Sequence, residues 1–179
     1  NEPDNAPGIE HGRSTLVFGE AALTRKKADN PDFVRRGWLL SVAARSTAGN
    51  LLSDASFSQV IADAKWIRAL GTRSRNRLIL RGSAGITWTN DFAALPPQLR
   101  FFAGGDRSVR GYGYQSIGPR NSDDRVIGGT SLLVASSEVE HYFTRNWGMA
   151  AFVDAGNAFS GTDYRPKIGA GLGLRWRSP

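Results

Sequence analysis

Cysteine is absent from all 179 residues of the chain, and histidine occurs only twice. The absence of cysteine excludes a disulfide framework, a thiol nucleophile and every cysteine-ligated metal site. Two histidines without any cysteine also argue against a zinc centre. We therefore expect no metal and no other cofactor.

Long apolar runs are missing as well. No stretch of about 18 apolar residues occurs, so the sequence predicts no transmembrane helix. Residues 1–9 are polar and acidic, and they lack the charged-then-apolar layout of a signal peptide. The mean hydropathy of −0.33 would fit a water-soluble protein. It also fits transmembrane β-strands, which are about 10 residues long and need an apolar side chain only at every second position.

Charge of one sign is not concentrated anywhere, although the formal net charge is +7. A basic balance is typical of proteins that bind nucleic acid or an anionic membrane surface. The lysines and arginines are spread along the chain, without a block of five or more like charges. Because strand alternation distributes them and the tryptophans over a sheet, we expect no nucleic-acid partner.

Seven segments alternate between apolar and polar residues with a period of two. In the last of them, Ile168, Leu172 and Trp176 fall on one face, with Gly169 and Arg175 on the other. Most connections are too short for a crossover helix, which predicts antiparallel neighbours. The predicted fold class is all-β, an antiparallel meander of about seven strands. The candidate strands are 14–26, 37–47, 56–70, 76–89, 129–143, 147–159 and 166–176.

All five tryptophans lie near the ends of these strands, on the apolar face. An aromatic girdle at a membrane interface would place them there. A soluble β-sandwich with one buried face per strand has the same alternation, so periodicity alone leaves barrel and sandwich open. The tryptophans are Trp38, Trp66, Trp88, Trp147 and Trp176.

The segment 90–127 interrupts the strand rhythm and is rich in glycine and proline. A loop of this length without regular structure is usually functional. Residues 100–114 read Arg-Phe-Phe-Ala-Gly-Gly-Asp-Arg-Ser-Val-Arg-Gly-Tyr-Gly-Tyr. This stretch resembles the sixth extracellular loop of the outer-membrane protein insertase superfamily, whose core is Val-Arg-Gly-Tyr or Val-Arg-Gly-Phe. The core residues here are Val109, Arg110, Gly111 and Tyr112.

The superfamily has a second motif, Phe-x-Asp-x-Gly, which is separated from the loop by one strand. It is present here as Phe152, Asp154 and Gly156. Residues 32–38 look like the turn before the ninth strand of these barrels. The resemblance implies that residues 1–179 form strands 8 to 14 of a 16-stranded transmembrane barrel, with 90–127 inserted into the lumen. The family's other strands and its periplasmic POTRA domains lie outside this sequence, so we expect it to be part of a longer protein.

The stretch Phe-Phe-Ala-Gly-Gly-Asp at 101–106 looks most like the branch that supplies the outer-membrane subunit of the translocation and assembly module, TamA. This resemblance implies insertion or translocation of autotransporter-like clients at the Gram-negative outer membrane, without enzymatic chemistry. It implies three partners, namely the lipid bilayer, a periplasm-spanning module subunit and unfolded client proteins. Barrel-assembly insertases and two-partner secretion transporters share the shorter core, so both remain alternatives.

The residues of the two motifs also permit a physical argument. Period two places Phe152, Asp154 and Gly156 on one face, and a carboxylate is costly on a face that contacts lipid. Asp154 is therefore expected to face the lumen, where the planar donor fork of Arg110 could bind it. The alternative is that Arg110 and Asp154 are ordinary solvated charges.

Other polar groups are less informative. Glu138 and Glu140 could suggest a paired-carboxylate acid–base site. Their alternate positions on one strand favour hydration of a barrel interior instead. His141 is expected to be an interfacial polar residue. The alternating glycines of 169–173 are not a phosphate loop because no helix follows them. No nucleophile–base constellation is visible, so the sequence does not predict an enzyme.

The barrels of this family have long outer loops and short inner turns, which gives an expected topology. The expected extracellular segments are 48–55, 90–127 and 160–165. The expected periplasmic turns are 27–36, 71–75 and 144–146.

Overall fold

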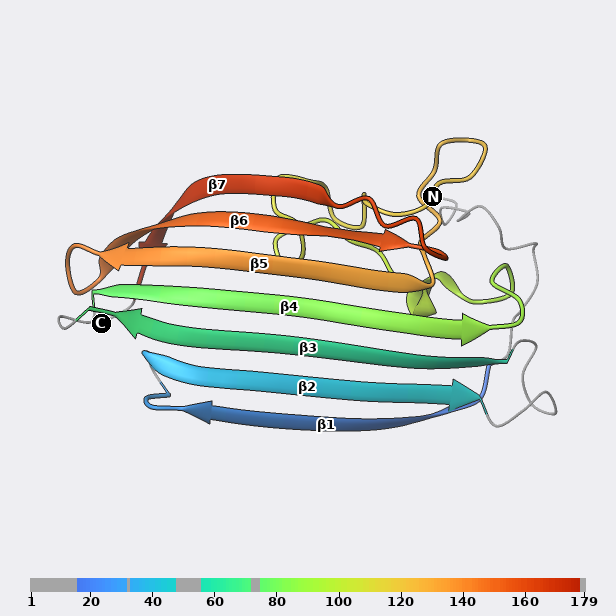
Figure 1. Cartoon of the computed structure of the whole chain (residues 1–179), viewed down its shortest axis with the longest axis horizontal. Helices are drawn as coiled ribbons and strands as arrows, with labels where there is room; N and C mark the ends of the chain where they lie inside the picture. The colour runs from blue at the N-terminus through green and yellow to red at the C-terminus, as the bar shows by residue number, and fades with distance from the viewer. Residues whose placement is uncertain (1–15, 32, 48–55, 72–74, 178–179) are drawn as a thin grey trace, which may run out of the picture.

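A computed structural model describes residues 16–31, 33–47, 56–71 and 75–177 of the chain. These residues form one antiparallel sheet of seven strands in sequence order (Figure 1). The predicted all-β meander is confirmed. The strands are β1 (Phe18–Ala28), β2 (Arg36–Thr47), β3 (Phe57–Leu70), β4 (Asn76–Thr89), β5 (Ser131–Tyr142), β6 (Trp147–Phe159) and β7 (Lys167–Trp176).

The predicted strand limits differ most from the structure at β1 and β5. The first strand was expected at 14–26, whereas β1 continues to Ala28, which pairs with Gly37. Its last residues are basic and carry no apolar alternation, so hydropathy could not reveal this pairing. The fifth strand was expected to begin at 129, but Gly129 pairs with Phe101 of the long loop. The predicted residues 14–15, 32, 48–55 and 72–74 lie outside the described part of the chain.

The two faces of the sheet differ in chemistry, as the alternation predicts. On β7 the large apolar side chains Ile168, Leu172 and Leu174 are well exposed, whereas Gly169 between them is buried. We call the face that carries the long loop the inner face and the opposite one the outer face. The outer face is an apolar surface without a protein layer among the described residues, as expected for strands that contact lipid.

The tryptophans lie on the outer face in two cross-strand pairs and one single position. Trp38 lies opposite Trp66, and Trp147 lies opposite Trp176. Both pairs are at the end of the sheet where β1, β3 and β5 end, which we call the turn end (Figure 1). Trp88 lies near the other end, the loop end. The arrangement matches an aromatic girdle, with most of the rings at the turn end.

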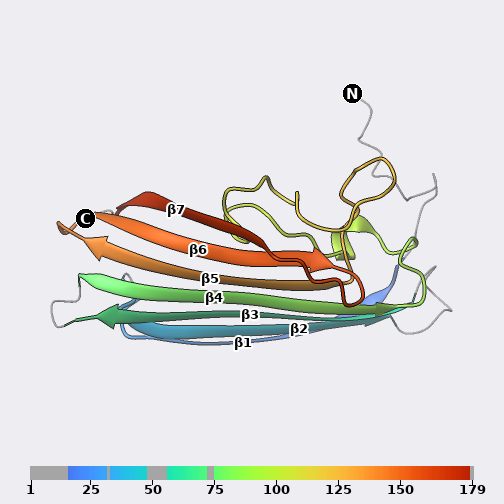
Figure 2. The same ribbon diagram turned by 45° about the horizontal axis from the view of Figure 1, so that its top comes forward.

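The loop of residues 90–130 stands over the inner face of the sheet (Figure 2). It was expected to lack regular structure, and this was wrong in part. It contains a short 3-10 helix, η1 (Pro97–Leu99), and isolated bridges join Phe101 to Gly129 and Ala103 to Ile117. Within the described residues, no helix is long and apolar enough to cross a membrane.

A buried arginine shapes the base of the loop. Arg100 is 7% exposed and donates hydrogen bonds to the carbonyls of Leu95, Ile127 and Ala93 at 2.7, 3.2 and 3.0 Å. Its guanidinium lies 4.6 Å from the centre of the Phe92 ring. Burial lowers the pKa of Arg100. The carbonyl contacts compensate the lost hydration, because buried polar groups must be hydrogen-bonded.

Two small apolar clusters attach the loop to the sheet. One contains Phe57 of β3 with Leu95 and Leu99 of the loop. The other contains loop residues and Val134 of β5, and its loop members are Ala103, Val109 and Ile117. The hydrophobic core of the described residues therefore lies between the loop and the inner face, where it positions the tip of the loop over β5 to β7.

Candidate functional site

Strands β4 to β7 place inner-face residues in rows across the sheet. In one row, Arg81, Ser136, Asp154 and Gly169 are consecutive cross-strand partners. In the next row, the partners are Ile79, Glu138, Phe152 and Gly171. Residues of four strands therefore lie beneath the tip of the loop, with side chains from β4, β5 and β6 and glycines from β7.

Arg110 at the loop tip contacts Asp154 of β6 through three hydrogen bonds. Its side-chain Nε donates to Oδ2 at 2.7 Å, and Nη2 donates to Oδ1 at 2.8 Å. Its backbone N–H also donates to Oδ2 at 3.1 Å. The expected Arg110–Asp154 contact is therefore present, in the bidentate geometry that gives the strongest carboxylate pairs. Asp154 is fully buried.

Two further residues hold the same guanidinium. Phe152 of β6 lies beneath it, with the ring centre 3.5 Å from Cζ, within the range of a cation–π contact. Glu138 of β5 accepts a hydrogen bond from Nη1 and forms a second ion pair. We call the set of Arg110, Glu138, Phe152 and Asp154 the arginine clasp.

The other motif residues hold the loop tip by backbone and packing contacts. Val109 is fully buried in the loop cluster. Gly111 has a φ of +90°, a conformation that only glycine adopts without strain. The Tyr112 hydroxyl donates to the carbonyl of Ile168 on β7 at 3.3 Å. Gly156 is buried on the inner face of β6, where a Cβ would collide with Val134.

The glycines of β7 make room for the clasp, a role that sequence reasoning missed. A Cβ at Gly169 would fall on the carbonyl oxygen of Arg110. A Cβ at Gly171 would lie 2.8 Å from the Phe152 ring. The only signal available was the row of small residues on one face of a strand, which indicates close approach of another group but does not identify it.

An alternating chain of ion pairs continues from the clasp toward the turn end. Glu138 also pairs with Arg175 of β7, and Arg175 pairs with Glu140 of β5 at 3.2 Å. Glu140 pairs in turn with Arg77 of β4. With Arg110 and Asp154, three arginines and three carboxylates form one electrically balanced network on the inner face.

The network ends on an aromatic residue of the turn between β1 and β2. Arg77 lies 4.1 Å from the centre of the Phe33 ring and donates to the carbonyl of Val34 at 2.8 Å. Phe33 also packs edge-on against Tyr142 of β5, with ring centres 5.3 Å apart. Polar contacts therefore run without interruption from the loop tip to the opposite end of the sheet.

The interpretation of Glu138 and Glu140 as groups that only hydrate a barrel interior was wrong. They are 5% and 3% exposed, and both are ion-paired. Burial next to arginines replaces their hydration. His141 points to the outer face, where its Nδ1 lies 2.5 Å from Asn76 Oδ1. Within the described residues, no group of three or more potential metal ligands comes together.

Comparison with known proteins finds a family that matches the chain. Residues 2–179 match the model of the Omp85 superfamily domain. A search of curated proteins finds the outer membrane protein assembly factor BamA of Nitratidesulfovibrio vulgaris. It is 27% identical over 178 residues, which cover 94% of this chain and 22% of the relative. The chain therefore spans about a fifth of the length of that relative.

A similar fold occurs in a solved structure. The crystal structure of BamA from Haemophilus ducreyi lacking POTRA domains 1–3 superposes with a TM-score of 0.72. The match covers 88% of this chain and 36% of that one, at 24% sequence identity. At this identity the likeness establishes the fold alone.

Replacing Arg110 by alanine should release the loop tip. The change leaves Asp154 and Glu138 buried with fewer partners, which we expect to cost on the order of 3 kcal/mol. The loop of the full-length protein should become protease-sensitive. Asp154→Asn should act in the same direction but more weakly, because the amide still accepts a hydrogen bond. A double-mutant cycle with Arg110→Ala and Asp154→Ala tests the pairing, and additive effects on loop protection would contradict it.

A methyl group at position 169 should also release the loop tip, without removing any charge. In Gly169→Ala, the new Cβ meets the Arg110 backbone, so the loop tip must move, at a cost of about 1–3 kcal/mol. Gly173→Ala is the matched control, since a Cβ there would meet only the end of the Arg175 side chain, at an ordinary contact distance of 3.4 Å. Limited proteolysis of both variants distinguishes the two positions. Equal loop protection in both would show that the close approach at Gly169 is unimportant.

Proposed function

The chain belongs to the Omp85 superfamily, and on that premise we propose that it forms part of the barrel wall of a factor that inserts or translocates other proteins. The location is the outer membrane of Gram-negative bacteria. The observation that carries the proposal is the arginine clasp, which holds a long loop against the inner face of the sheet. The matched relative is described as an outer membrane protein assembly factor, which supports this role.

The proposed mechanism requires no covalent chemistry. An exposed strand edge can pair with a client strand through main-chain hydrogen bonds, and this pairing can template the client's own sheet. The clasp would keep β5, β6 and β7 in one rigid unit with the loop while the wall opens elsewhere. We therefore assign Arg110, Phe152 and Asp154 to positioning of the loop.

We further propose that these seven strands are strands 8 to 14 of a 16-stranded barrel that carries POTRA domains. In this arrangement the loop 90–130 enters the lumen from the extracellular side, and the inner face of the sheet is the lumen wall. The barrel is not closed by the seven strands themselves. Partners would be the bilayer on the outer face and unfolded client proteins.

Within the superfamily, the stretch 101–106 favours the translocation and assembly module branch, TamA. This finer assignment implies a periplasm-spanning partner subunit and autotransporter-like clients. Support comes from the sequence of the loop only. A general barrel-assembly insertase and a two-partner secretion pore are the competing functions, because the shorter Val-Arg-Gly-Tyr core occurs in all three.

Cysteine labelling tests the proposed orientation. These 179 residues contain no cysteine, so a single substitution introduces the only thiol of this segment, and the unsubstituted full-length protein gives the background signal. Thr162→Cys at the loop end should react with a membrane-impermeant maleimide in intact cells. Arg145→Cys at the turn end should react only after the outer membrane is breached. The opposite pattern would invert the proposed topology.

Depletion of the full-length protein tests the proposed function. Mature autotransporters in the outer membrane should decline, while their unfolded precursors accumulate in the periplasm. A wild-type copy should restore them, Arg110→Ala should restore them poorly, and Arg107→Ala should behave as wild type because Arg107 is an exposed residue of the same loop. Loss of all outer-membrane barrels would favour the general insertase. Loss of one secreted substrate with normal barrels would favour the secretion pore.

A further inference from the structure

Two arginines lie directly opposite each other on the outer face at the turn end. Arg36 of β2 is the cross-strand partner of Arg68 of β3, and both are exposed. Like charges in this position repel and destabilise a sheet. Within the part of the chain that the structure describes, neither guanidinium takes part in an ion pair. An anion from outside the sheet would convert this repulsion into attraction.

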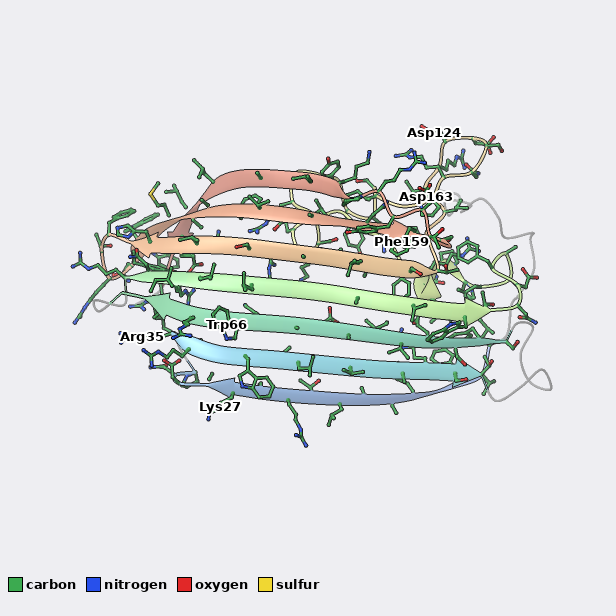
Figure 3. All side chains as sticks on the ribbon, in the orientation of Figure 1. Lys27, Arg35, Trp66, Asp124, Phe159 and Asp163 are labelled. Carbon is green, nitrogen blue, oxygen red and sulfur yellow. The ribbon has the colours of Figure 1, made fainter. Side chains whose placement is uncertain are left out.

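A cavity of about 410 Å³ lies at this position. Its lining includes Arg36, Arg68 and Lys27 together with the ring pair Trp38 and Trp66. Lys27 of β1 is the cross-strand partner of Trp38, so it shares a row of the outer face with the two indole rings, and Arg36 and Arg68 occupy the next row. Figure 3 shows Lys27 and Trp66 near the same end of the sheet.

One carboxylate also lines the cavity, and its charge has partners. Asp29 Oδ1 accepts the backbone N–H groups of Arg35 and Arg36 at 2.9 and 3.0 Å. The hydrogen bond from Arg36 lowers the pKa of Asp29, so this group is ionised at neutral pH. Three cations and one carboxylate leave the cavity with two net positive charges.

The residues around the cavity indicate how deep it lies in the membrane, and this depth indicates which anion can reach it. Tryptophan pairs mark the interface between the hydrocarbon and the headgroups. From Trp38 and Trp66 toward the middle of the sheet, the next outer-face residues of β2 and β3 are Leu40 and Ala64. Arg36 and Arg68 lie on the other side of the rings, at headgroup depth. Their long side chains can extend along the rings while the charge remains in the polar layer.

We propose that this cavity binds the phosphate of an anionic phospholipid in the leaflet at the turn end of the barrel. The phosphate lies between Arg36 and Arg68, with Lys27 beside it. The acyl chains run along Leu40 and Ala64. The lipid thereby stabilises the pairing of β2 with β3.

Native mass spectrometry of the full-length protein tests the site. The protein is extracted from vesicles of phosphatidylcholine that contain phosphatidylglycerol, and retained phosphatidylglycerol is counted. Arg36→Gln with Arg68→Gln should weaken retention by about 30-fold, because two cations near an anionic headgroup are lost. The lysine double variant should retain the lipid. The control is Arg120→Gln with Arg165→Gln, which removes the same charge from exposed arginines at the loop end.

The thermal stability of the same variants gives a second, independent measurement. In pure phosphatidylcholine the glutamine double variant should be at least as stable as wild type, since the repulsion is relieved. With phosphatidylglycerol present, wild type should become the more stable protein. Heat-modifiable migration on gels confirms that each variant is folded.

Three outcomes would overturn the proposal. Equal retention of phosphatidylglycerol by wild type and the glutamine variant would exclude the site. Displacement of the lipid by inorganic phosphate at comparable concentration would show a site for free phosphate. Unchanged lipid retention with loss of a co-purifying periplasmic protein would assign the cavity to an acidic protein partner.

Discussion

Burial of the Asp154 carboxylate is the constraint on which the inner face depends. Asp154 is fully buried, and a buried carboxylate without a partner is strongly destabilising. β6 carries no basic residue, and among the described residues the cation that pairs with Asp154 comes from the loop. Arg110 supplies it, and the loop must then reach β6 with its backbone as well as its side chain. Because the loop backbone comes so close to the sheet, Gly111 adopts a positive φ and β7 carries glycines where it meets the loop tip.

The alternation of charges explains how six ionised groups can share one inner face. Arg110 and Arg175 each pair with two carboxylates and Arg77 with one, and Glu138 and Glu140 each pair with two arginines. Removal of one member leaves its neighbours buried with incomplete partners, which costs more than the pair contributed. The loop tip and the turn that carries Phe33 therefore belong to one electrostatic unit. A change at either end is expected to affect the other through these contacts.

The sequence predicts the strands well because alternation depends only on which face each residue occupies. It also predicts Arg110 and Asp154 as partners, because a carboxylate cannot face lipid and the loop motif offers a guanidinium. The sequence does not predict the contacts of Arg100 with three carbonyls, since they depend on the path of the loop backbone. The same holds for the pairing of Glu138 with Arg175, two residues whose inner-face positions do not reveal how far their side chains extend.

The clasp also specifies the register of the sheet. Ser136, Asp154 and Gly169 share one row, while Glu138, Phe152 and Gly171 share the next. A slip by one residue between β5 and β6 would turn one set of side chains to the outer face. A slip by two would keep the faces but would either put Glu138 directly opposite Asp154 or move it two rows away, and neither arrangement reproduces the contacts of the clasp. The same loop that occupies the inner face therefore selects one pairing of three strands among several that their apolar alternation would permit.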